Sequence, residues 1–178
     1  IKEVEKNNIT IDNSSIVDVG SGTGYLLRII NNNYSNVKLT GFDNYKELNT
    51  LASFICPNAE ILEKDIFSVF NSRYDFIFCT QTMEHLIDPK KAINNLLNGC
   101  NQNGALILTV PDGRMDRTNS VGKYKNNQGY WGHINFWSIE SWEVFIKKSV
   151  KGRSFEVGVL ANHNILYAII HNNKILIN

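Results

Sequence analysis

The chain has 178 residues, 43% of them hydrophobic, and its 18 lysines and arginines nearly balance its 17 aspartates and glutamates, for a net charge of +1. This length predicts a single domain (1–178) with a self-sufficient core, and the charge balance disfavours nucleic acid or another large polyanion as the main partner. No apolar run is long enough to span a bilayer, and the three cysteines have no C-x-x-C spacing, which disfavours a zinc site or disulfide framework and fits a reducing cytoplasm.

Short apolar runs alternate with helix-length segments along the first two thirds of the chain. This alternation predicts a parallel sheet whose strands are joined by right-handed crossovers. The run YDFIFC is apolar almost throughout, which is typical of a strand buried on both faces. The predicted strands are 16–19, 37–42, 59–62, 74–79 and 105–110, and the predicted helices are 25–31, 46–54 and 89–98.

The last third of the chain has a different pattern. Ser138 is a suitable N-cap for a helix in which Trp142, Phe145 and Ile146 share one face. Two strands at 155–160 and 165–170 follow, and the short segment between them allows only an antiparallel hairpin. The predicted fold class is therefore α/β: a doubly wound sheet of five parallel strands closed by a C-terminal antiparallel hairpin.

A glycine-rich turn, VDVGSGTGYL (17–26), joins the first strand to the first helix. Glycines allow a tight turn and let a ligand approach the backbone amides. Tyr25 stands where a dinucleotide-binding fingerprint has its third glycine, which disfavours an NAD-type oxidoreductase. The chain also lacks the G-x-x-x-x-G-K-[ST] motif of nucleoside triphosphate binding.

This turn resembles the first motif of the class I S-adenosylmethionine-dependent methyltransferases, of the type that acts on small molecules or sugars, and further matches follow in the family's order. The resemblance implies a Rossmann-like fold and S-adenosyl-L-methionine as cofactor. It implies that Asp43 binds the ribose hydroxyls and that Asp65 approaches the adenine, although an aspartate after a strand is by itself more often a helix cap or a solvated turn. The segment TQTMEHL (80–86) resembles the family's E-H-L segment. The expected cofactor-binding residues are Asp18, Gly20, Gly22, Gly24, Tyr25, Asp43, Asp65, Ile66 and Gln81.

Two histidines are candidates for a catalytic base. A hydroxyl acceptor is a poor nucleophile and benefits from a base that works near neutral pH, which is the usual role of histidine. His85 follows the fourth strand, and His133 lies in the aromatic segment YWGHINFW (130–137). His133 ranks slightly above His85, and either could instead have a packing role. His163 and His171 are expected on the surface.

The long connection 112–137 is the candidate acceptor-binding segment, because such loops are usually functional or disordered. Aromatic rings suit sugars and cations suit phosphate or carboxylate groups, while the alternative is a solvated loop with incidental charge. The segment GHINFWS (132–138) resembles methyltransferases of glycan pathways. The candidate residues here are Arg114, Arg117, Lys123, Tyr124, Lys125, Tyr130, Trp131 and Trp137.

The sequence thus predicts methyl transfer to a hydroxyl of a sugar or glycan precursor, possibly anionic, in the cytoplasm. Transfer to a nitrogen or carboxylate of a small metabolite, and a non-catalytic cofactor-binding module, remain alternatives. No metal site is expected, since the chain has neither C-x-x-C nor H-E-x-x-H. Because the first strand begins near residue 16, we expect the family's N-terminal cap helix to be missing or trimmed.

Overall fold

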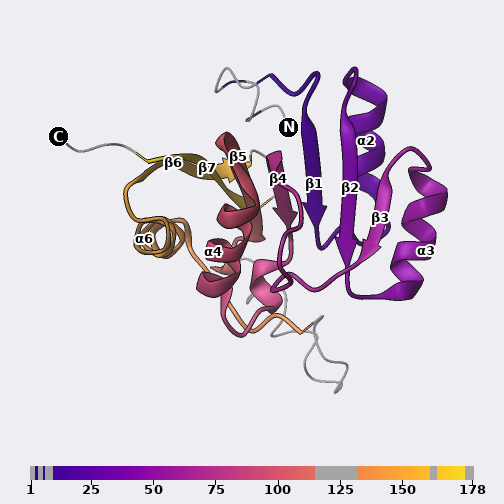
Figure 1. The fold of residues 1–178 in the computed structure, drawn as a ribbon. Helices are drawn as coiled ribbons and strands as arrows, with labels where there is room; N and C mark the ends of the chain where they lie inside the picture. The colour runs from indigo at the N-terminus through magenta and orange to yellow at the C-terminus, as the bar shows by residue number, and fades with distance from the viewer. Residues whose placement is uncertain (1–2, 4–5, 7–9, 115–131, 161–163, 175–178) are drawn as a thin grey trace, which may run out of the picture.

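A seven-stranded sheet organises the structure, a computed structural model that describes residues 3, 6, 10–114, 132–160 and 164–174 (Figure 1). The strand order is β3-β2-β1-β4-β5-β7-β6, with the first five parallel and β7 antiparallel to both of its neighbours. This confirms the predicted five parallel strands and closing hairpin. The strands are β1 (Ser15–Val19), β2 (Lys38–Asp43), β3 (Glu60–Glu63), β4 (Tyr74–Thr80), β5 (Cys100–Pro111), β6 (Arg153–Leu160) and β7 (Ile165–Lys174).

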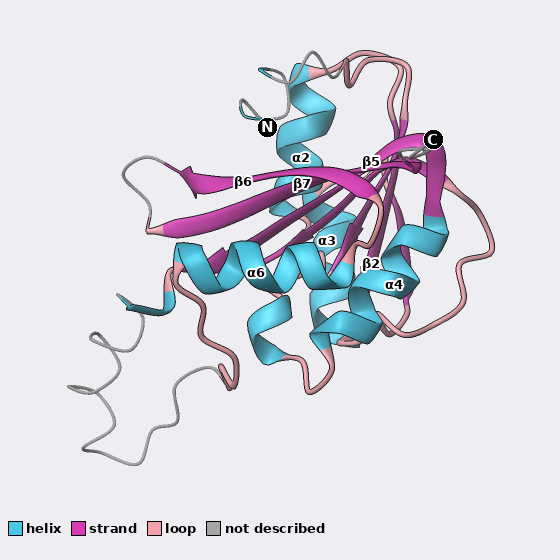
Figure 2. Cartoon of the chain, turned by 90° about the vertical axis from the view of Figure 1, so that its left-hand side faces the viewer, coloured by secondary structure: helices cyan, strands magenta, loops and turns pink. Residues whose placement is uncertain are grey.

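Helices cover both faces of the sheet (Figure 2). On one face α4 packs against β4 and β5, and α6 packs against β6 and β7; on the other, α2 and α3 pack beside β2. This is the doubly wound arrangement that the alternating elements predicted. The helices are α2 (Tyr25–Asn33), α3 (Lys46–Ile55), the short 3₁₀ helix η1 (Met83–His85), α4 (Pro89–Gly99) and α6 (Ile139–Ser149).

The core divides into two clusters, one on each side of the sheet. Alternate residues of β1 supply both: Val17 and Val19 join the cluster that contains α4 and α6, and Ile16 joins the one under α2. Trp142 of α6 is fully buried, and its Nε1–H donates to the Tyr167 carbonyl at 3.1 Å, so the largest core side chain leaves no polar atom unsatisfied.

Local signals set where the helices begin. At α4, the Asp88 carboxylate accepts the Lys91 N–H at 2.9 Å, and Pro89 occupies the first turn. Ser138 caps α6 as predicted, and forms a capping box with Ser141. None of the helices in the described ranges has the length and apolar character needed to cross a membrane.

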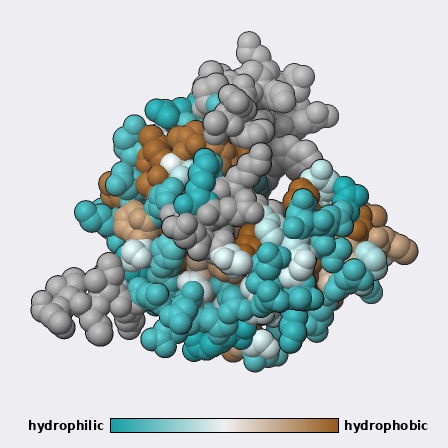
Figure 3. All heavy atoms as spheres, turned by 90° about the horizontal axis from the view of Figure 1, so that it is seen from above, coloured by the Kyte–Doolittle hydropathy of each residue, from teal (hydrophilic) through white to brown (hydrophobic). Residues whose placement is uncertain are grey.

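The parallel strands place their carboxyl ends at one edge of the sheet, the lower one in Figure 1. This edge collects the glycine turn after β1, Asp43 at the end of β2 and η1 after β4. From above, in Figure 3, the described residues that can be seen are mostly hydrophilic, with a hydrophobic patch on one side. Ligands of open α/β sheets bind at the carboxyl ends, where the strand order reverses direction, here between β1 and β4.

Candidate cofactor and acceptor site

The turn after β1 has a backbone that only glycines adopt easily. Gly20, Gly22 and Gly24 all have positive φ angles, of 78°, 53° and 75°. A Cβ at Gly20 would collide with the side chain of Thr82, and one at Gly24 would lie 3.0 Å from the Cβ of Ala52 in α3. The turn therefore needs glycine for its backbone conformation. At Gly20 and Gly24 it also needs glycine because Thr82, in the segment after β4, and Ala52 of α3 lie so close.

Asp43 links the end of β2 to this turn. Its Oδ2 accepts the Gly22 N–H at 2.9 Å, and its Oδ1 accepts the Tyr45 N–H at 2.9 Å. An ionised carboxylate has about four acceptor positions, so both oxygens can still accept hydrogen bonds from two hydroxyls of a ligand. Asp43 is 7% exposed and lines a cavity, which fits the ribose-binding role implied by the resemblance.

Asp18 is a buried carboxylate behind the glycine turn. It is 2% exposed, and its Oδ1 has no hydrogen-bond partner within the described part of the chain. Burial, with a smaller contribution from the nearby charge of Asp43, raises the pKa of Asp18 to about 7. A buried, incompletely satisfied carboxylate suits a cationic group such as the cofactor's ammonium.

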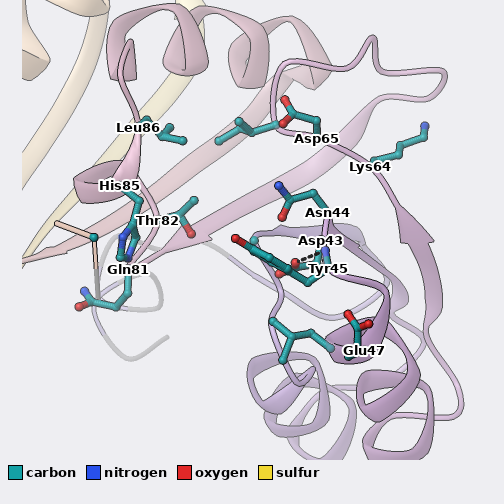
Figure 4. A pocket seen from close by; sticks show the side chains of 14 residues that line it. Asp43, Asn44, Tyr45, Glu47, Lys64, Asp65, Gln81, Thr82, His85 and Leu86 are labelled. Carbon is teal, nitrogen blue, oxygen red and sulfur yellow. Dashed lines mark hydrogen bonds between the residues drawn. The ribbon is translucent and has the colours of Figure 1, made fainter. Parts of the chain in front are cut away.

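A cavity of about 850 Å³ lies along the carboxyl edge of the sheet (Figure 4). One wall carries Asp43, Tyr45 and Glu47, and the facing wall carries Thr82 and His85. This volume suits a cofactor together with a small acceptor. Of the predicted cofactor residues, Gly20, Asp43, Asp65, Ile66 and Gln81 line the cavity, and Asp18, Gly22, Gly24 and Tyr25 are not among its lining residues.

The segment after β3 forms one side of the cavity, where the resemblance places the adenine. Asp65 is exposed at the cavity, and its Oδ1 accepts the Phe67 N–H at 2.7 Å, which fixes the carboxylate in a tight turn. Ile66 is buried against it. Asn95 of α4 fixes this turn, because its Nδ2 donates to the carbonyls of Ile66 and Ser68 at 2.7 and 3.0 Å.

Two other predicted residues have different surroundings. Gln81 has a φ of 53°, and its Nε2 donates to Thr109 Oγ1 at 3.2 Å, so the side chain is held at the end of β4. Tyr25 is 58% exposed, with the Arg28 guanidinium 4.9 Å from its ring centroid. It is the first residue of α2, directly after the N-cap residue Gly24.

The two candidate bases, His85 and His133, lie together. Their ring centroids are 4.6 Å apart, with the rings inclined at 75°. His85 lines the cavity, as does Gly132 beside His133. Glu84, the glutamate of the E-H-L segment, is 1% exposed, and its Oε1 lies 4.0 Å from His85 Nε2.

Backbone contacts hold His133 near η1. The N–H groups of Ile134 and Asn135 both donate to the Glu84 carbonyl, at 2.9 and 3.0 Å. The Asn135 side chain donates to the Leu86 carbonyl at 2.7 Å. These contacts explain how residues from distant parts of the sequence meet at one end of the cavity.

The structure corrects the expectations about Trp137 and His171, and it shows an ion pair at Arg114. Trp137 is 8% exposed and packs against Trp142 at 5.1 Å between ring centroids, so it belongs to the core rather than to a sugar-binding surface. Arg114 forms a bidentate ion pair with Asp112, at 2.8 and 3.1 Å. His171 is half-buried in β7 rather than exposed. The remaining candidates of this loop and His163 lie outside the described residues: Arg117, Lys123, Tyr124, Lys125, Tyr130 and Trp131.

Comparison with known proteins identifies the family and the fold. The family model described as a methyltransferase domain matches residues 3–149. A plantazolicin methyltransferase in complex with SAH superposes with a TM-score of 0.77 at 16% identity, over 97% of this chain and 80% of that one. The chain belongs to the class I S-adenosylmethionine-dependent methyltransferase family, and its cofactor is S-adenosyl-L-methionine.

The curated relatives are longer than this chain and match it over only part of their own length. A tRNA U34 carboxymethyltransferase of Campylobacter curvus is 30% identical over 109 residues, which are 57% of this chain and 36% of that protein. A carboxy-S-adenosyl-L-methionine synthase of Staphylococcus epidermidis is 31% identical over 54% of this chain and 45% of that protein. A ubiquinone biosynthesis O-methyltransferase of Coxiella burnetii is 30% identical over 62% of this chain and 48% of that protein. The chain thus spans less than half the length of each of these relatives.

Proposed function

We propose that this chain transfers the methyl group of S-adenosylmethionine to a small acceptor, and more specifically to a hydroxyl of a sugar or glycan precursor. When bound, the cofactor supplies a methyl group on a positively charged sulfur, which is already a strong electrophile. The protein's task is then to hold the cofactor, align the acceptor and remove the acceptor's proton.

Three groups of this chain would hold the cofactor. The glycine turn lets the ligand approach its backbone amides, because no side chain intervenes. Asp43 would accept the ribose hydroxyls, and Asp65 would accept from the adenine amino group. Asp18 and Gln81 are proposed for the amino-acid end, with Asp18 compensating the ammonium charge from behind the turn.

The observation that favours a hydroxyl acceptor is the pair of His85 and His133, whose ring centroids are 4.6 Å apart. His85 lines the same cavity as Gly20 of the glycine turn. A hydroxyl gains from an imidazole that accepts its proton while the oxygen attacks the methyl carbon. Nitrogen and carboxylate acceptors gain little from such a base. The choice of a sugar rests on the likeness of residues 132–138 to methyltransferases of glycan pathways.

The test is an acceptor screen with an isotopically labelled methyl donor, covering sugars, nucleotide sugars, catechols, amines, carboxylates and a tRNA. We expect a hydroxyl compound to gain the mass of one labelled methyl group. On that acceptor, His133→Ala should lower kcat by about 100-fold or more while the affinity for S-adenosylhomocysteine is unchanged. His171→Ala, a histidine of β7, is the matched control and should retain full turnover.

Each alternative predicts a different pattern. Unchanged turnover of His133→Ala on the best acceptor would favour methylation of a nitrogen or carboxylate and remove the proposed base. Cofactor binding without release of S-adenosylhomocysteine for any acceptor would favour a non-catalytic binding module. Methylation of the tRNA alone would overturn the expectation, drawn from the charge balance, that nucleic acid is not the partner.

A further inference from the structure

Three side chains at the η1 end of the cavity have the composition of a metal-binding site. Glu84, His85 and His133 each offer one ligand atom, and these atoms all lie within 4.8 Å of one another. Two imidazole nitrogens and one carboxylate oxygen form a common ligand set for Zn²⁺ and for non-haem Fe²⁺.

The geometry is close to that of a bound ion. Nitrogen and oxygen ligands lie about 2.0–2.2 Å from Zn²⁺, so two ligands of a tetrahedral ion are about 3.4 Å apart. The Glu84 Oε1 and His85 Nε2 atoms are 4.0 Å apart. The three ligand atoms, all within 4.8 Å of one another, must therefore come closer together when an ion binds.

The surroundings favour a cation and hold the ligands in place. A carboxylate as buried as Glu84, at 1% exposure, is costly unless positive charge lies beside it. The Glu84 carbonyl accepts two backbone N–H groups from residues 134 and 135, so the segment that carries His133 is fixed to the one that carries the other two ligands. His85 lines the cavity, so an ion held there would keep open coordination positions toward the acceptor.

We propose that Glu84, His85 and His133 bind one divalent transition-metal ion of the zinc class, with open positions that face the acceptor. The ion would bind the acceptor hydroxyl, which then loses its proton to solvent water. The oxygen of the acceptor would then bond to the methyl carbon of the cofactor, while the carbon–sulfur bond breaks and its electron pair stays on sulfur. This consequence rests on the proposed methyl transfer to a hydroxyl. It deepens that proposal, because with the ion bound the two histidines promote loss of the acceptor's proton through the ion that they hold.

The test uses the full chain, stripped of metal, and titrated with Co²⁺ as a spectroscopic substitute for Zn²⁺. We expect one equivalent to bind, with visible absorption bands of four- or five-coordinate Co²⁺ that added Zn²⁺ abolishes. His133→Ala and Glu84→Gln should each weaken binding by at least about 100-fold, since even indirect ligand contacts cost 10–100-fold. His171→Ala should bind as the unchanged chain does.

The affinity for S-adenosylhomocysteine, measured on the same samples, shows that each variant is folded. Absence of a saturable one-equivalent signal, or unaltered Co²⁺ binding by both ligand variants, would overturn the metal site while leaving the proposed methyl transfer in place. Co²⁺ binding by a chain that does not bind S-adenosylhomocysteine would instead overturn the proposed function and leave the metal site standing.

Discussion

The carboxylate of Asp43, at the end of β2, accepts a hydrogen bond from the backbone N–H of Gly22 at 2.9 Å, which joins the ribose-side acid to the glycine turn after β1. Two parts of the proposed cofactor site are therefore held together before any ligand binds. Such preorganisation lowers the cost of ordering the site on binding.

Asp43→Asn should weaken S-adenosylhomocysteine binding by about 10–100-fold, because a hydrogen bond to a charged group contributes about 1.5–3 kcal/mol. Asp65→Asn, at an exposed position, should have a smaller effect. Isothermal titration calorimetry of both variants checks the order. An equal loss for both would argue against a special role for Asp43.

Gly20→Ala should abolish cofactor binding and lower the free energy of unfolding by about 1–3 kcal/mol, since the residue has a φ of 78° and its Cβ would meet Thr82. The matched control is Gly152→Ala, with a φ of 73° and no atom within 4 Å of the added Cβ. The control should lose stability alone, as measured by urea unfolding. If Gly152→Ala also lost cofactor affinity, the effect would be one of general instability.

Asp18→Asn should have opposite effects on stability and binding. Because the folded-state pKa of Asp18 is raised to about 7, the folded protein binds the proton more tightly than the unfolded chain does. The free energy of unfolding should therefore fall as the pH rises from about 4 to about 7, and stay at the lower value above that.

Replacing Asp18 by asparagine removes this loss, so the variant should be more stable than the unchanged chain at about pH 8, by up to about 4 kcal/mol, and similar to it at about pH 4. Its affinity for S-adenosylhomocysteine at about pH 8 should nevertheless fall, because no anion then faces the ammonium. Urea unfolding and calorimetry at both pH values measure the two effects. A pH-independent stability difference would contradict the raised pKa.

Two asparagines test whether the cavity has one end that binds the acceptor and another that binds the cofactor. Asn135→Ala removes the 2.7 Å bond to the Leu86 carbonyl and should lower kcat, by about 10-fold or more, with cofactor affinity unchanged. Asn95→Ala removes the bonds that hold the turn of Asp65 and should weaken cofactor binding with less effect on kcat. Steady-state kinetics and calorimetry compare them. If both variants changed kcat and cofactor affinity to the same extent, the cavity would not have separate acceptor and cofactor ends.

The sheet and the cofactor side of the site could be predicted from the sequence because their signals are local. The run 74–79 is apolar except for Asp75, and the turn at 20–24 has positive φ angles at its three glycines. The start of β5 was placed too late, at residue 105 instead of Cys100. Its first residues are polar, and their strand pairing depends on a tertiary contact with Tyr74.

The acceptor side could not be predicted in the same way because its contacts join distant segments. Nothing in the segment around Glu84 indicates that this acidic side chain is buried, or that its carbonyl accepts the N–H groups of residues 134 and 135. The aromatic segment 130–137 makes Trp137 a candidate for contact with a sugar. Its packing against Trp142 follows from where α6 lies on the sheet.

The central claim is that the glycine turn, Asp43 and Asp65 together form an adenosyl pocket, and calorimetric titration of the full chain with S-adenosylhomocysteine tests it most directly. We predict saturable binding at one site per chain, weakened strongly by Asp43→Asn and abolished by Gly20→Ala. A folded chain that gives no binding heat and no thermal stabilisation with S-adenosylhomocysteine or S-adenosylmethionine would contradict this account.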